Sequence, residues 1–273
     1  MWIQMERGVK VKQILLSGLL LLLLTPIQAP AQSRFDGTWK IDLDARQPPT
    51  KPEVYLLRGG VYRCPSCDPP LDIQADGRDH KITGEACYDT VSLKVVDDRT
   101  TEETDKRNGK TVGTSRMTVS SDGSTATFEW TESCNAKGDL VSGKDIMSRI
   151  EKGPQGAHPV SGSWQITKRV QASDNALIVT LKLEGDTFSF ADPTGQGYEA
   201  KLDGTETPIR GDLENTLVSV KRIGEDTIEE TDKRGGKTVE VVRFTASADG
   251  MAISVTMEDK VKESTRQFFL RKQ

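Results

Sequence analysis

Apolar and polar side chains alternate along residues 90–96 and 125–132, which is the pattern of a half-buried β-strand. In the second segment Ala126, Phe128 and Trp130 share one face, and threonine and glutamate take the other. The same alternation returns later in the chain at Ile253, Val255 and Met257. Beyond the first thirty or so residues no helical periodicity appears, so we predict an all-β fold of antiparallel meanders, each of about eight strands in a small barrel or sandwich.

Turn residues separate the predicted strands. Asn108-Gly109 supplies two positions that tolerate positive φ, as a tight hairpin requires, and Gly235-Gly236 does the same later. Asp122-Gly123 predicts a further hairpin. Connections this short join antiparallel neighbours.

The chain also repeats itself. EETDKRNGKTV at 102–112 returns as EETDKRGGKTV at 229–239, an offset of 127 residues that also aligns the flanking segments. Residues 153–159, rich in glycine and proline, have the composition of a linker. We therefore expect two tandem barrel-like units, 32–152 and 160–273, each of about 115 residues.

The repeated polar phrase has two interpretations. As structure, it is the end of one strand, a tight turn and the start of the next, with its charges on a solvated face. As function, it is a binding edge of a hairpin that the protein uses twice. The structural interpretation is favoured, and the residues concerned are Glu103, Thr104, Asp105, Lys106, Glu230, Thr231, Asp232 and Lys233.

Residues 1–31 have the layout of a secretory signal peptide. Three basic residues precede an apolar run at 14–24, and Ala29-Pro30-Ala31 resembles a cleavage site. The apolar run is shorter than the roughly 20 residues of a membrane-spanning helix. We expect a periplasmic or secreted protein with no membrane insertion after cleavage.

Four cysteines lie in the first copy and none in the second. An even number in an exported protein suggests disulfides. The CPSC sequence favours pairing of Cys64 with Cys67, which leaves Cys87 for Cys134. The alternative is a zinc site formed by Cys64, Cys67, His80 and Cys87.

Charge and motif content narrow the function further. The chain has 37 basic and 41 acidic residues, a formal net charge of −4, and the charges are interspersed. Nucleic acid and anionic membranes demand clustered Lys and Arg, so neither is an expected partner. The sequence contains no nucleophile elbow, phosphate loop or zinc-protease motif, and its two histidines, His80 and His158, are predicted to lie in loops. We expect no cofactor and no resident metal.

The two copies share the same residues at their starts and near their ends. A Gly-x-Trp opens the copy and an arginine lies near its end: Gly37, Trp39 and Arg149 in the first, Gly162, Trp164 and Arg271 in the second. Together with phrases such as YDTVSLKVVDD and SDNALIVTLKLEGDT, this resembles a group of exported bacterial proteins described as lipocalin-like. The resemblance implies a β-barrel whose base is closed by the Trp, with the terminal Arg of the same copy packed across it, and a Gram-negative periplasmic setting. It implies no particular activity.

These observations favour a non-enzymatic protein that binds a small, partly apolar molecule inside one or both units. The first alternative is an envelope-structural or protein-interaction module whose barrels are filled by their own side chains. The second is an enzyme that uses carboxylates, which would require a buried carboxyl group with a raised pKa in a cleft.

Overall fold

The computed structural model describes residues 33–273, so the predicted signal peptide lies outside the described residues. This part of the chain is β-sheet apart from one short 3-10 helix, η1 (Asp174–Ala176), which confirms the all-β prediction. No helix within residues 33–273 is long and apolar enough to cross a membrane.

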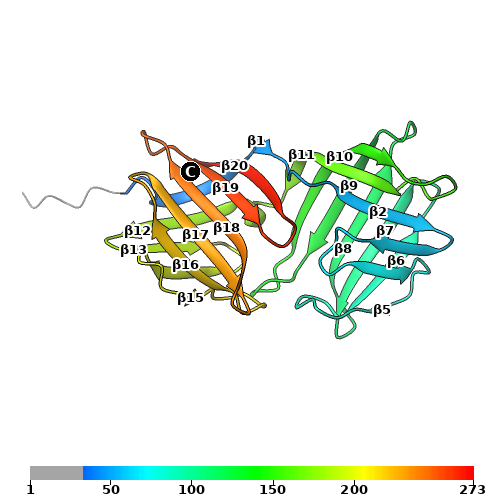
Figure 1. The fold of residues 1–273 in the computed structure, drawn as a ribbon, viewed down its shortest axis with the longest axis horizontal. Coiled ribbons are helices and arrows are strands. Elements are labelled where there is room, and N and C mark those ends of the chain that lie inside the picture. The colour runs from blue at the N-terminus through cyan, green and yellow to red at the C-terminus, as the bar shows by residue number, and fades with distance from the viewer. Residues whose placement is uncertain (1–32) are drawn as a thin grey trace, which may run out of the picture. The chain divides into compact units, whose positions relative to one another are not determined.

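Ten antiparallel strands, β2 to β11, form a nearly closed sheet that we call the N-terminal barrel (Figure 1). Their order, β4-β3-β2-β11-β10-β9-β8-β7-β6-β5, is an up-and-down meander in which β11 returns to the side of β2. The strands are β2 (Glu53–Arg58), β3 (Val61–Cys64), β4 (Leu71–Gln74), β5 (His80–Lys81), β6 (Thr90–Val95), β7 (Thr100–Arg107), β8 (Lys110–Val119), β9 (Thr125–Glu132), β10 (Val141–Lys152) and β11 (Gly162–Ala172).

The second sheet, the C-terminal barrel, has the order β14-β13-β12-β1-β20-β19-β18-β17-β16-β15. Ten strands stand where periodicity predicted about eight, because strands as short as β5 and β15, of 2 residues each, show no periodicity. The strands are β1 (Gly37–Gln47), β12 (Ile178–Glu184), β13 (Thr187–Ala191), β14 (Gly197–Lys201), β15 (Thr207–Pro208), β16 (Leu217–Arg222), β17 (Thr227–Arg234), β18 (Lys237–Ala246), β19 (Ala252–Asp259) and β20 (Ser264–Lys272).

The two sequence copies exchange their first strands. β1, from the first copy, lies between β12 and β20 of the second, with Trp39 opposite Val179 on one side and Lys272 on the other. β11, from the second copy, lies between β10 and β2 of the first. The predicted boundary near residue 155 therefore separates the sequence copies, whereas the N-terminal barrel spans 53–172 and is inserted between β1 and β12 of the C-terminal barrel.

Barrel closure makes this exchange possible. In a closed meander the first strand pairs with the last, so either copy can supply it. The segment that joins β1 to β2 contains Pro48, Pro49 and Pro52. Proline fixes φ and holds the preceding residue extended, which opposes a tight β1–β2 hairpin. Residues 153–161, in contrast, connect β10 directly to its sheet neighbour β11.

The cations that cover the two buried tryptophans differ from those that the sequence predicted. Trp39 and Trp164 are fully buried, each donating its indole N–H to a backbone carbonyl, as predicted for barrel plugs. However, Arg149 covers Trp164 of the other copy, with its guanidinium carbon 4.0 Å from the ring centre. Lys272, whose ammonium nitrogen is 5.4 Å from the ring centre, covers Trp39. Arg271 is one residue away from that position and therefore points outward, where it binds Asp42 at 3.0 Å.

The glycine of each Gly-x-Trp has a physical role. Gly37 and Gly162 have φ values of 142° and 132°, which L side chains rarely adopt. A β-carbon on Gly162 would lie 2.2 Å from the Glu151 carbonyl oxygen, and one on Gly37 would lie 3.0 Å from the Lys272 side chain. Glycine thus lets the capping segment approach the Trp strand closely.

Both favoured disulfides are present, Cys64–Cys67 and Cys87–Cys134. Because all four sulfurs are used, the zinc alternative that required Cys64, Cys67 and Cys87 as thiolates is wrong. The second bridge joins the loop before β6 to the loop after β9. Two disulfides indicate an oxidising, extracytoplasmic environment.

Candidate functional site

The C-terminal barrel encloses a cavity of about 530 Å³. Its closed end and walls are apolar, and Tyr198, Glu230, Asp232 and Glu240 are polar groups that line it. The apolar lining includes Ile41, Val242, Phe244, Val255, Phe268 and Leu270, from β1, β18, β19 and β20.

The interior of the N-terminal barrel is largely filled and keeps a cavity of only about 80 Å³. Tyr55 and Tyr62 stack within it, with ring centres 6.3 Å apart. Nearby, Asp145 accepts two hydrogen bonds from Arg169, at 2.7 and 2.8 Å, and one from the Trp130 indole at 3.3 Å.

The repeated polar phrase lies on β7 and β17, which have neighbours on both sides, so neither is an edge strand of its sheet. The favoured expectation of a solvated face holds only for alternate residues. Because side chains alternate along a strand, every second charge points inward. Glu230 and Asp232 are 7 % and 9 % exposed and line the large cavity with their own barrel's residues. Glu103 lines the small cavity of the N-terminal barrel.

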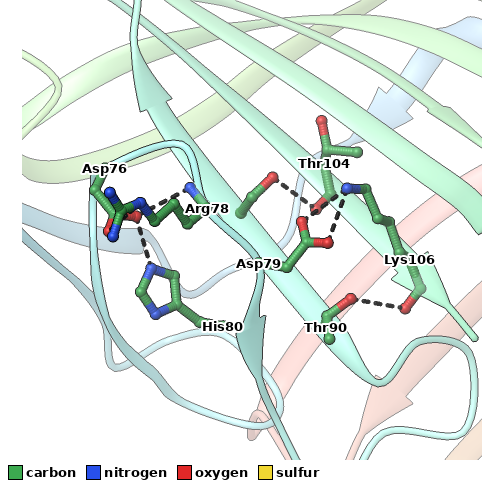
Figure 2. Close-up of polar contacts among 8 residues, drawn as sticks. Asp76, Arg78, Asp79, His80, Thr90, Thr104 and Lys106 are labelled. Carbon is green, nitrogen blue, oxygen red and sulfur yellow. Dashed lines mark hydrogen bonds and ion pairs between the residues drawn. The ribbon is translucent and has the colours of Figure 1, made fainter. Parts of the chain in front are cut away.

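The alternate members of the phrase point outward and form ion pairs. Lys106 has its ammonium group 2.8 Å from the Asp79 carboxylate, and the Thr90 hydroxyl donates to the Lys106 carbonyl of β7 (Figure 2). The Ser92 hydroxyl donates to the Thr104 carbonyl of the same strand. Lys233 binds Glu206 at 2.7 Å in the same way in the second barrel. His80 pairs with Asp76 at 2.9 Å rather than with any side chain of the cavity (Figure 2). These outward contacts tie β7 and β17 to the loops beside β5 and β15.

A carboxyl pair with a tyrosine lies in the large cavity. The Tyr198 hydroxyl donates to Glu230, and Asp232 lies two residues further along the same inward face of β17. Burial, and then the neighbouring Asp232, raise the pKa of Glu230 well above its usual range. Burial and the nearby Glu240 raise the pKa of Asp232 to about 7. Within residues 33–273, the Oδ1 atom of Asp232 has no hydrogen-bond partner, so this buried oxygen is available to a ligand.

The N-terminal barrel keeps the same pair without the tyrosine. Burial and the adjacent Asp105 raise the pKa of Glu103 to about 8, and burial with Glu85 raises the pKa of Asp105 to about 6. Gly113 leaves room for Asp105, since a β-carbon there would lie 2.7 Å from its carboxylate. The corresponding position of the C-terminal barrel, 127 residues later, is Glu240.

The open end of the large cavity carries charges of both signs. Acidic Glu240 accepts a hydrogen bond of 3.5 Å from Arg266. Burial raises the pKa of Glu240, and of Glu132 on β9, so the charged form of each carboxyl group is disfavoured. The remaining charged residues that line the open end are Asp192, Arg46 and Arg169.

Comparisons with family models, curated proteins and solved structures found no match for this chain. The possible ligands and reactions are therefore inferred from the residues that line the cavity. Apolar walls can hold the apolar part of a ligand, and a protonated carboxyl group can donate a hydrogen bond to a carbonyl or hydroxyl oxygen of that ligand. The pair also holds a proton near neutral pH, as an acid–base catalyst requires. None of the His, Cys, Asp and Glu side chains of residues 33–273 are grouped as metal ligands.

Sequence reasoning missed most of this site. For Glu230 and Asp232 a signal existed, because they continue the inward face that begins at Ile228. For Tyr198 the signal was weaker, namely its alternation with Ala200 on a short strand. Nothing in the sequence indicated Arg46, because its neighbours belong to strands of the other copy.

Proposed function

We propose that this protein is an exported, non-enzymatic binding protein that holds a small, partly apolar molecule in its C-terminal barrel. The observation that carries the proposal is the cavity of about 530 Å³, which combines thirteen apolar lining residues with the inward Tyr198, Glu230 and Asp232 and with charged residues at its open end. Ligand pockets of proteins typically have volumes of about 300–1,000 Å³ and this kind of lining. The filled N-terminal barrel acts as a structural partner in this proposal.

The start of the sequence and the disulfides support a periplasmic or secreted location. The sequence resemblance to lipocalin-like exported proteins supports the same assignment. At neutral pH the Glu230–Asp232 pair retains a proton, so it can donate a hydrogen bond to a ligand carbonyl or hydroxyl while the Asp232 Oδ1 atom accepts one.

Binding is tested with the neutral fluorescent probe Nile red. The purified mature protein should bind it, and Val255→Phe should weaken that binding strongly because the new ring occupies the cavity. The N-terminal barrel already carries Phe128 at the matching position, so this fold accepts the substitution. Ile223→Trp, on an exposed side chain of the same barrel, is the control. Equal binding by Val255→Phe and Ile223→Trp would refute the cavity as the site.

A second candidate, acid–base catalysis, is favoured by one observation: two buried carboxyl groups, Glu230 and Asp232, line the same cavity, and the pKa of Asp232 is raised to about 7. Any ligand that co-purifies can be extracted, returned to fresh protein in excess and followed by mass spectrometry. A binding protein returns the ligand unchanged. A product that exceeds the protein in amount, and that Asp232→Asn fails to form, would favour the enzyme.

A further inference from the structure

Three arginines meet at the open end of the large cavity. Arg46 lies near the end of β1, Arg169 on β11 and Arg266 on β20. All three line both the cavity of the C-terminal barrel and a second hollow of about 630 Å³ outside it. Because β1 and β11 are the exchanged strands, their exchange places Arg46 and Arg169 side by side.

The three side chains differ in their partners. Arg169 is held by Asp145, which is 1 % exposed, and Arg266 touches Glu240 at 3.5 Å. Arg46 has no hydrogen-bond or ion-pair partner among residues 33–273, although it is only partly exposed. Burial and the two neighbouring arginines lower the pKa of Arg46 to about 10, so the guanidinium stays charged at neutral pH. A half-buried cation without a counter-ion is unfavourable unless an anion joins it.

The acidic groups of the open end do not supply that anion. Asp145 is already engaged by Arg169, and Glu240 by Arg266. Glu132 carries a raised pKa from burial, and it forms no ion pair within residues 33–273. Asp192 uses its carboxylate to bind the Thr194 hydroxyl and the backbone N–H of Gln196.

We propose that Arg46, assisted by Arg266 and Arg169, binds the oxyanion head group of a single-chain amphiphile whose apolar part lies in the cavity. This inference rests on the proposed binding function and assigns its ligand class. The planar guanidinium fork matches the two oxygens of a carboxylate or of a phosphate ester. The apolar body then extends from the open end towards Phe244 and Leu270 at the closed end.

Displacement of Nile red from the mature protein tests the proposal. Dodecanoate, dodecyl phosphate, dodecanol and dodecylamine are compared as competitors below their micelle concentrations. Because a hydrogen bond between charged groups strengthens binding more than a neutral one does, the wild type should bind the better oxyanion about tenfold or more tightly than dodecanol. The two oxyanions then distinguish a carboxylate site from a phosphate site.

The variants assign the effect to the arginines. The competitors are compared on each variant against that variant's own affinity for Nile red. Arg46→Gln should lose the preference for the oxyanion over dodecanol, and Arg266→Gln should reduce that preference. Arg222→Gln, on the exposed outer surface of the same barrel, should change neither. Equal displacement by dodecanol and both oxyanions, a preference for dodecylamine, or an Arg46→Gln variant that matches Arg222→Gln would each overturn the anion site while Nile red binding stands. Absence of Nile red binding by the wild type would overturn the proposed function, and the anion site with it.

Discussion

The two barrels descend from one repeated sequence and share a strand order, yet one is hollow and the other is filled. At positions 127 residues apart, Val255 of the C-terminal barrel faces its interior where the N-terminal barrel has Phe128, and Met257 stands where it has Trp130. The backbone framework is the same, so the volume of the interior is decided by a few side chains. A duplicated barrel can thus keep one copy for stability and open the other.

The carboxyl pair sharpens this comparison because both barrels retain it. Burying two carboxyl groups is unfavourable, as their raised pKa values show. In the hollow barrel the pair gains Tyr198 and faces a cavity. In the filled barrel, Leu71 replaces the tyrosine and little space remains. We infer that the pair serves a ligand in the C-terminal barrel alone.

The largest expected effects come from the buried plugs. Trp39→Ala should destabilise the C-terminal barrel, and Trp164→Ala the N-terminal barrel, by about 3–5 kcal/mol each, as large buried aromatics do. Hydrogen exchange read by mass spectrometry reports the barrels separately. Faster exchange in β17–β20 with unchanged β6–β9 is expected for Trp39→Ala. Faster exchange in β6–β9 with unchanged β17–β20 in Trp39→Ala would show that the first strands are not exchanged.

Loss of the Cys87–Cys134 bridge comes next. It closes a loop with a sequence separation of 47 residues. Replacing both cysteines with serine should destabilise the N-terminal barrel by about 3–4 kcal/mol, because the unfolded chain regains freedom. The C-terminal barrel, which has no cysteine, should keep its denaturation midpoint in the same variant. The short Cys64–Cys67 bridge serves as the control, since its removal frees much less chain.

Stability against pH is the third test. The pKa of Asp232 is raised from 3.8 to about 7, so between these values the folded state holds a proton that the unfolded state has released. The contribution of Asp232 to the stability of the C-terminal barrel is therefore fully present below about pH 4 and is lost as pH rises to about 7, by on the order of 4 kcal/mol.

Asp232→Asn should reduce this fall in stability and leave the part due to Glu230, whereas the exposed Asp98→Asn should leave the profile unchanged. In the N-terminal barrel the pKa of Asp105 is raised to about 6 and that of Glu103 to about 8, so Asp105→Asn should flatten the fall in stability below about pH 6 and leave the fall between pH 6 and 8. Urea denaturation from pH 4 to 8, combined with hydrogen exchange, measures both. A wild-type C-terminal barrel that gains stability over this range would contradict the buried pair.

Local patterns made much of the fold predictable. Alternation located the longer strands, paired glycines located the hairpins, and the CPSC spacing led to both disulfides. The exchange of β1 and β11 was not predictable in this way, since a first strand has an equivalent site in either barrel. The two connections differ in composition, since residues 48–52 contain three prolines and no glycine, whereas residues 153–161 contain two of each.

The site was less predictable than the fold because it depends on what lies across the barrel. The alternation that places Ile228 inward also places Glu230 and Asp232 inward, but charged residues are usually solvated and that expectation prevailed. The cavity depends on the small side chain of Val255. The sequence around Val255 does not tell which side chains lie opposite it across the barrel. The wrong cap, Arg271, arose because the turn before β20 is four residues shorter than the turn before β10. The offset of 127 is lost there, and the residue that matches Arg149 is Lys272.

The two caps provide the finest comparison. Arg149 stacks on Trp164 and also donates hydrogen bonds to the Ser161 and Pro159 carbonyls, at 2.6 and 2.7 Å. Lys272 has only its longer approach to Trp39. Arg149→Ala should therefore destabilise the N-terminal barrel by about 1–2 kcal/mol, and Lys272→Ala the C-terminal barrel by about 0.5 kcal/mol. Arg271→Ala, which removes an outward ion pair, should have a smaller effect still, because exposed pairs contribute little. If Arg271→Ala instead exceeded Lys272→Ala in urea denaturation, the register of β1 against β20 would be one residue away from that described, and the cation that covers Trp39 would be Arg271.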